Sequence, residues 1–183
     1  MKQTKKITVS AAAVALTVLF MALGAYIEVF DLTSAALCSI IMAFVFVEVG
    51  KPYTYLVWLG SSLLGFVFFS HSLVWITYFL VFGIYPILKA YIEKLKRPLW
   101  IPVKLLTFAA SAGAIIFTSE VLLGIPFFEE DVTFPLFGEN TVIFKIAIYL
   151  GLIVMLAVYD YFMTVMIRVY FSTVRKRIAH LLK

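Results

Sequence analysis

The stretch VFGIYPILKAYIEKLKRP, residues 81–98, begins with apolar residues and ends with basic ones. Its first half has the composition of a helix that crosses a membrane. Pro86 has no N–H to donate to the carbonyl of Phe82, so we expect the helix to bend there. Lys89 follows Pro86 by about one helical turn and still lies within the apolar segment. This stretch therefore predicts a bent membrane helix whose lysine reaches either water or a buried partner.

The composition of the whole chain also favours a membrane protein. Of its 183 residues, 64% are hydrophobic and only 14% are charged, whereas soluble domains carry about 25% charged residues. The formal net charge of +5 could suggest a nucleic-acid partner. However, the basic residues are scattered over membrane-proximal ends of apolar segments, and this pattern disfavours nucleic-acid binding.

Six segments are long and apolar enough to cross a bilayer, which takes roughly 20 residues. These segments are 7–27, 33–49, 53–70, 73–92, 100–124 and 142–170. The connections between the second, third and fourth segments are very short, so these helices are expected to be antiparallel neighbours. The sequence therefore predicts an all-α integral membrane protein, in which residues 1–183 form a single domain built as a bundle of six transmembrane helices.

The basic residues predict the orientation of this bundle. Cytoplasmic connections collect Lys and Arg, and with six helices both termini lie on the same side. Every Lys and Arg of the chain except Lys145 falls on that side, while the opposite side gathers acidic residues. We therefore expect both termini to be cytoplasmic, in a multi-pass protein of a bacterial plasma membrane. The basic side is expected to contact anionic membrane lipid.

Four ionisable residues are expected to lie inside the cytoplasmic half of the bundle, each on a different helix: Glu48, Lys89, Lys104 and Asp160. Charges within a membrane are costly and usually face the protein interior in pairs. One interpretation is structural, with ion pairs Glu48–Lys89 and Asp160–Lys104, or a permutation of them, fixing the helix packing. The other is functional, with these groups moving, relaying a proton or contacting a partner.

The outer face carries the candidates for ligand binding. The long connection 124–140 alternates acidic residues with phenylalanines, and it is either a lid over the bundle or a loop that dips into lipid. Six side chains near the outer ends of the helices are candidate substrate-binding groups: Glu28, Asp31, His71, Trp75, Glu120 and Lys145.

No enzymatic activity, metal site or cofactor is predicted. The two histidines, His71 and His180, are expected on opposite faces of the membrane, so they cannot share a metal ion. The sequence has no HExxH or GxSxG motif. It also lacks a Walker-type GxxxxGK[ST] loop, so the chain has no ATP-driven motor of its own.

Ala11 and Ala15 lie four residues apart in the Ala-rich first segment, so they share a face that another helix could approach closely. With this face, six helices, both ends inside and about 180 residues, the chain resembles the substrate-binding S component of energy-coupling factor transporters. The resemblance implies that Ala11 and Ala15 dock on a transmembrane coupling subunit and that separate ATPases supply the energy. It also implies that a substrate binds near the outer face.

The most favoured function is therefore a membrane subunit that binds a small, vitamin-like molecule for uptake. A non-transporting membrane scaffold or assembly factor is the first alternative, and a tightly packed core without an outer cavity would favour it. A small independent transporter or flippase is the second alternative. The buried charges support that second alternative, but six helices without inverted repeats are few for alternating access.

Overall fold

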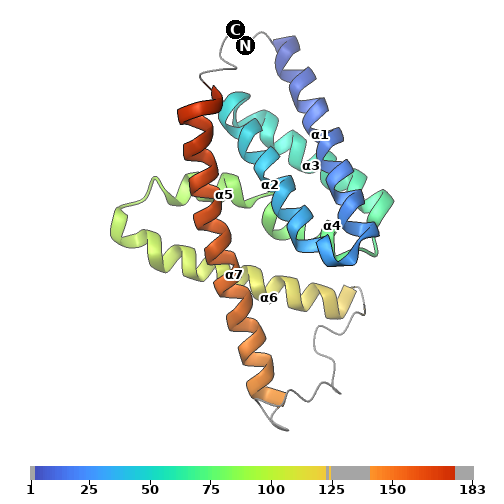
Figure 1. The fold of residues 1–183 in the computed structure, drawn as a ribbon, viewed down its shortest axis with the longest axis vertical. Helices are drawn as coiled ribbons and strands as arrows, with labels where there is room; N and C mark the ends of the chain where they lie inside the picture. The colour runs from blue at the N-terminus through green and yellow to red at the C-terminus, as the bar shows by residue number, and fades with distance from the viewer. Residues whose placement is uncertain (1–2, 123, 125–140, 176–183) are drawn as a thin grey trace.

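The computed structural model describes residues 3–122, 124 and 141–175, and the regular structure in this part of the chain is helical (Figure 1). In chain order the elements are α1 (Gln3–Tyr26), the 3₁₀ turn η1 (Glu28–Phe30), α2 (Asp31–Glu48), α3 (Lys51–Phe69), α4 (Leu73–Thr77), the π-helical segment η2 (Tyr78–Phe82), α5 (Tyr85–Ile92), α6 (Arg97–Leu122), α7 (Thr141–Val169) and the π-helical segment η3 (Tyr170–Val174).

Within the described residues, six helices are long and apolar enough to cross a membrane: Gln3–Tyr26, Asp31–Glu48, Lys51–Phe69, Leu73–Ile92, Arg97–Val121 and Ile143–Thr173. The predicted all-helical fold with six candidate spans is confirmed. The last span ends at Thr173 rather than 170, and two helices start earlier than predicted, α1 at Gln3 and α6 at Arg97. Lysine, arginine and glutamine favour helix, so these helices extend beyond the apolar residues that define the predicted segments.

The tight turn between α2 and α3 depends on Gly50. Its φ of 106° lies in the left-handed region that side chains disfavour, and glycine adopts it without strain. Pro52 then stands in the first turn of α3, where its missing N–H costs no helical hydrogen bond. This pair of residues ends one helix and starts the next within three positions.

The bend expected at Pro86 takes the form of a π-helical segment followed by a new helix. In η2 the Gly83 N–H donates to the Tyr78 carbonyl at 2.7 Å, five residues back. The α-helix then restarts as α5 with Pro86 in its first turn, where no N–H is needed. The span Leu73–Ile92 therefore consists of α4, η2 and α5 in succession.

The first helix packs on its neighbours through small residues. One face of α1 is buried and comprises Ser10, Ala13, Thr17, Met21 and Gly24. A Cβ atom at Gly24 would lie 2.8 Å from Val74 Cγ2 and 2.9 Å from Ser34 Cβ. The absence of a side chain at Gly24 thus allows α1 to approach both α2 and α4.

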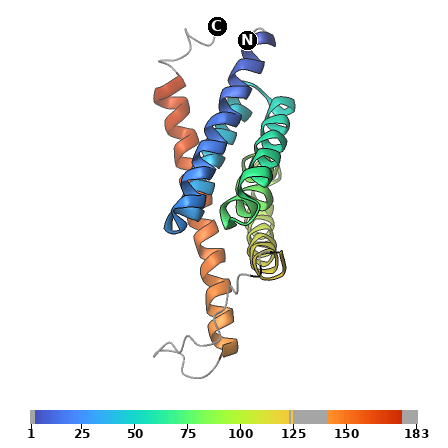
Figure 2. The same ribbon diagram turned by 90° about the vertical axis from the view of Figure 1, so that its right-hand side faces the viewer.

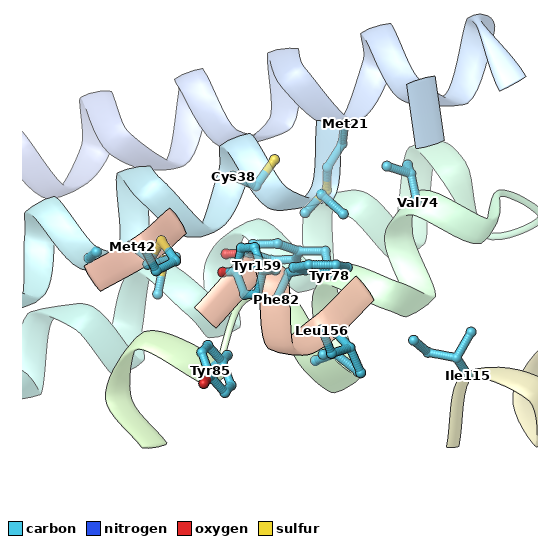
Figure 3. Close-up of a cluster of buried hydrophobic side chains, with 14 of the residues drawn as sticks. Met21, Cys38, Met42, Val74, Tyr78, Phe82, Tyr85, Ile115, Leu156 and Tyr159 are labelled. Carbon is cyan, nitrogen blue, oxygen red and sulfur yellow. The ribbon is translucent and has the colours of Figure 1, made fainter. Parts of the chain in front are cut away.

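The core contains tyrosines whose hydroxyl groups are paired. Figure 3 shows Tyr78, Phe82 and Tyr159 gathered at its centre, with Tyr85, Met21 and Met42 around them. The Tyr78 hydroxyl shares a 2.7 Å hydrogen bond with Ser61, and the Tyr159 hydroxyl is hydrogen-bonded to Ser39. A buried phenol needs such a partner, so these bonds fix η2 against α3 and α7 against α2.

The helices do not all run alongside one another. The beginning of α1 and the end of η3 lie at the same end of the molecule (Figures 1 and 2), while α6 runs across α7 (Figure 1). The two crossing helices are joined by polar bonds, among them the 2.8 Å bond that the Tyr149 hydroxyl donates to the Ala109 carbonyl. Much of α6 is left uncovered, including Leu105, Leu106 and Phe117.

We predict that Gly24→Ala destabilises the fold, because the new Cβ would overlap Val74 and Ser34. Overpacking of this kind costs about 1–3 kcal/mol. The measurement is thermal unfolding in detergent, with Gly113→Ala as the matched control, since a Cβ at Gly113 would meet no atom within 4 Å. Equal stability of the two variants would show that α1 does not pack this closely.

Candidate functional site

A recess of about 550 Å³ lies where the α1–α2 turn meets the α3–α4 turn. Its lining residues are Ala25, Tyr26, Asp31, Phe68, Phe69, Ser70, His71, Ser72 and Leu73. The recess forms because α1–α2 and α3–α4 are neighbouring helical hairpins that turn at the same end. It lies at the end of α1 that is farther from the N-terminus.

Local sequence positions the polar groups of the recess. Asp31 is half-buried in the first turn of α2, where the partial positive charge of the helix end stabilises a carboxylate. Ser72 caps α4, and its hydroxyl oxygen accepts the Val74 N–H at 3.3 Å. His71 precedes this cap and is exposed. The recess therefore offers a carboxylate, an imidazole, hydroxyl groups and aromatic rings, a combination that can hold a small molecule with a ring and polar substituents.

Two of the six predicted substrate-binding residues meet in this recess. Asp31 and His71 are both among its lining residues, although they come from different helical hairpins. Glu28 lies in η1, directly before α2, and its side chain lies outside the described residues. The α1–α2 and α3–α4 turns thus bring together an acid and a histidine that are forty positions apart in the sequence.

Trp75 packs inside the bundle, although it was predicted to bind substrate. Its indole N–H donates to the Ser62 carbonyl at 2.8 Å, and its ring stacks on Phe79 at 6.1 Å between centroids. The Trp58 ring also stacks on Phe79, with 5.3 Å between the ring centroids and nearly parallel planes. These rings join α3 to the π-helical segment, so the contacts of Trp75 are structural.

The other predicted outer-face residues lie elsewhere. Glu120 and Lys145 are exposed on α6 and α7, and neither is among the described residues that line the recess. Of the predicted lid 124–140, only Gly124 belongs to the described part of the chain, so the prediction of a lid falls outside it.

A second group of functional candidates lies in the helix core around Asp160. Lys89 and Asp160 form an ion pair through Asp160 Oδ1, and their side chains are only 3% and 13% exposed. The Tyr85 hydroxyl donates to the same oxygen at 2.6 Å. Tyr85 and Lys89 are four residues apart, so α5 presents both on one face toward α7.

Lys104 completes this group from a third helix. Its Nζ donates to Asp160 Oδ2 at 2.6 Å, so α6 and α5 supply one lysine each to a single carboxylate on α7. Lys89 also donates to the Thr164 hydroxyl at 2.8 Å. Glu93 Oε1 lies 3.1 Å from Lys89 Nζ and 3.8 Å from Lys104 Nζ. With two lysines and two acids, the cluster balances its charge.

The prediction that Glu48 pairs with Lys89 is wrong. Glu48 Oε1 lies 3.0 Å from the Nε of Arg175, just beyond η3, and Glu48 is therefore separate from the Asp160 cluster. The error arose because the depth of a residue along its helix was used to choose its partner. Depth says nothing of which neighbouring helix a side chain faces, and Glu48 at the end of α2 faces Arg175.

Ala11 and Ala15, the predicted docking residues, are both exposed. They lie on the side of α1 away from the buried face of Ala13 and Thr17. Among the described helices, none covers this pair, so the surface that the resemblance assigns to a partner is open.

Residues that the sequence analysis missed follow a simple spacing. Tyr85, Glu93 and Thr164 each stand four positions from Lys89 or Asp160, and each contacts the cluster. An i, i+4 search from each predicted intramembrane charge would have found them. Within residues 3–122, 124 and 141–175, no three His, Cys, Asp or Glu side chains are placed to hold a metal ion.

No family model, curated protein or solved structure matches this chain. Function must therefore be argued from the geometry of the sites, since neither a relative nor a shared fold supplies it.

We predict that Lys89→Met and Asp160→Asn are strongly coupled. Removing one partner of a buried pair leaves an uncompensated charge and costs about 3–5 kcal/mol, so Lys89→Met should cost much less once Asp160 is already neutral. The measurement is a double-mutant cycle of unfolding in detergent. Lys94→Met is the control, because Lys94 is exposed one turn further along. Additive costs for Lys89 and Asp160 would contradict the pair.

Proposed function

We propose that this chain is an integral protein of a bacterial plasma membrane that binds a small, vitamin-like molecule at its outer face for uptake. In this proposal the chain is the substrate-binding subunit, and a separate coupling subunit and ATPases supply the energy. The recess lined by Asp31 and His71 is the observation that carries the proposal.

The orientation is supported by the connections between helices. Lys51 begins α3 directly after the α2–α3 turn, the α5–α6 connection contains Lys94 and Lys96, and Arg97 begins α6. In a chain with six spans, these connections lie on the same side as the start of α1 and the end of η3. Cytoplasmic connections are rich in Lys and Arg. The recess, formed by the intervening turns, then faces outward.

The size and lining of the recess support binding of a small molecule. Ligand sites are typically concavities of about 300–1,000 Å³ with a few polar groups set among apolar and aromatic side chains. The recess has a volume of about 550 Å³ and combines Asp31 and His71 with Phe69 and Tyr26. A scaffold that only packs against partner helices needs no such outward recess, so this observation favours a binding subunit.

The open face of α1 supports a partner in the membrane. Ala11 and Ala15 offer a smooth surface on which a second helix could pack closely. The opposite face of α1 packs against α2 and α3. A coupling subunit could therefore bind without disturbing the internal packing of the chain.

We predict that the protein, gently purified from its own host membrane, retains a small molecule at a ratio of one to one, detectable by native mass spectrometry. Asp31→Asn with His71→Ala should abolish this retention, because both side chains line the recess. Glu120→Gln, an exposed change outside the recess, is the control and should leave it intact. A wild-type protein that carries only lipid would contradict the proposal and favour the scaffold.

We also predict that Ala15→Trp prevents co-purification of a coupling subunit and ATPases while the purified chain stays folded. The indole would block close helix packing on an exposed face. Pull-down from the host membrane with subunit identification by mass spectrometry is the measurement. Ala157→Trp, an exposed change on α7, is the control and should leave the association intact. Loss of folding in Ala15→Trp would show that this face packs internally.

A further inference from the structure

A second cavity lies between α2 and α7, in a part of the fold that the proposed function does not use. It has a volume of about 170 Å³ and is lined by Ile40, Ala43, Phe44, Val47, Met163, Met166, Ile167, Val169 and Tyr170. The four lining positions on α2 follow the i, i+3, i+4, i+7 spacing of one face, and so do Met163, Met166, Ile167 and Tyr170 along α7 and η3. The cavity is therefore a groove that runs along both helices for about two turns.

The groove is apolar along its length. Ala43 and Met163 are buried and form its floor, while Met166 and Val169 lie on its exposed rim. The Tyr170 ring packs edge-on against Phe44, with 5.6 Å between ring centroids. These side chains offer contacts to an apolar chain.

A positive charge stands beyond one end of the groove. Glu48 follows the lining residue Val47, and its Oε1 forms a salt bridge of 3.0 Å with the Nε of Arg175. The Arg175 guanidinium also lies 5.1 Å from the centroid of the Phe171 ring. The Arg175 side chain is 48% exposed, whereas that of Glu48 is only 7% exposed. Arginine has five N–H donors, so the groups that do not face Glu48 remain able to bind a phosphate.

We propose that this groove binds one anionic phospholipid, with an acyl chain between α2 and α7 and the phosphate at Arg175. The size of the groove argues against a partner helix, because a helix with its side chains is about 10–12 Å across. An acyl chain gains little free energy when it moves from among other lipid tails into the groove. Selectivity therefore rests on the charge-assisted bonds that the Arg175 guanidinium can donate to phosphate.

The site is distinct from the outer recess. Asp31 and Ile40 belong to the same helix, nine residues apart, with Asp31 on the recess and Ile40 at the start of the groove. With cytoplasmic termini, Arg175 lies at the inner leaflet. The lipid site requires the same membrane orientation as the proposed function, but it does not require a transported ligand.

The test is native mass spectrometry of the full chain in detergent, incubated with equal amounts of phosphatidylglycerol, phosphatidylcholine and oleate. We expect one phosphatidylglycerol per chain, preferred over phosphatidylcholine by about tenfold, which corresponds to about 1.4 kcal/mol. Arg175→Gln should remove this preference. Lys94→Gln, which removes an exposed basic residue in the α5–α6 connection, should leave it intact.

A substitution that fills the groove with a large side chain should prevent the lipid from binding. Val47→Trp places an indole on the lining of the groove, and Met166→Trp does so from its exposed rim should the first variant fail to fold. Val154→Trp, on an exposed position of α7, is the matched control. Equal retention of the two phospholipids, retention of oleate in place of phosphatidylglycerol, or unchanged binding in a folded groove-filled variant would overturn the proposal.

Discussion

The ion pair between Lys89 and Asp160 is the constraint on which the packing of the second half of the chain depends. Both side chains are buried, and a charge in such surroundings is tolerated only with an opposite charge and hydrogen bonds beside it. Asp160 accepts bonds from α5 and α6 at once, through Lys89 and Lys104. In lipid, apolar contacts with one neighbouring helix or another differ little in free energy. These polar bonds therefore decide that α5, α6 and α7 meet.

The first half of the chain is held together by different contacts. Small residues on α1, such as Gly24, allow close approach, and the hydroxyl pair of Ser61 and Tyr78 joins α3 to η2. The recess lies in this half, whereas the charge cluster lies in the other. The molecule thus separates a polar junction that fixes helices from the recess between the α1–α2 and α3–α4 turns, and this separation fits the proposed binding subunit better than a charge-driven transporter.

The sequence predicts the helices of this protein well because length and hydropathy alone decide which segments can cross a membrane. It also predicts that Lys89, Lys104 and Asp160 lie in the same half of the bundle, and the structure joins them. It fails on Glu48, because depth does not tell which helix a side chain faces. It predicts a bend at Pro86 but not the π-helical segment that absorbs it. Asp31 and His71 meet because neighbouring hairpins turn at the same end, a consequence of short connections, whereas the packing of Trp75 has no signal in the sequence.

Infrared difference spectroscopy of the wild-type protein against Asp160→Asn, both in lipid bilayers at neutral pH, tests the central ion pair most directly. We expect the substitution to remove the absorption of an ionised carboxylate, because two lysines form salt bridges with Asp160. Loss of the absorption of a protonated carboxylic acid would show that these salt bridges are absent. In that case Asp160 would be neutral in the membrane, and it could not unite the three helices by charge.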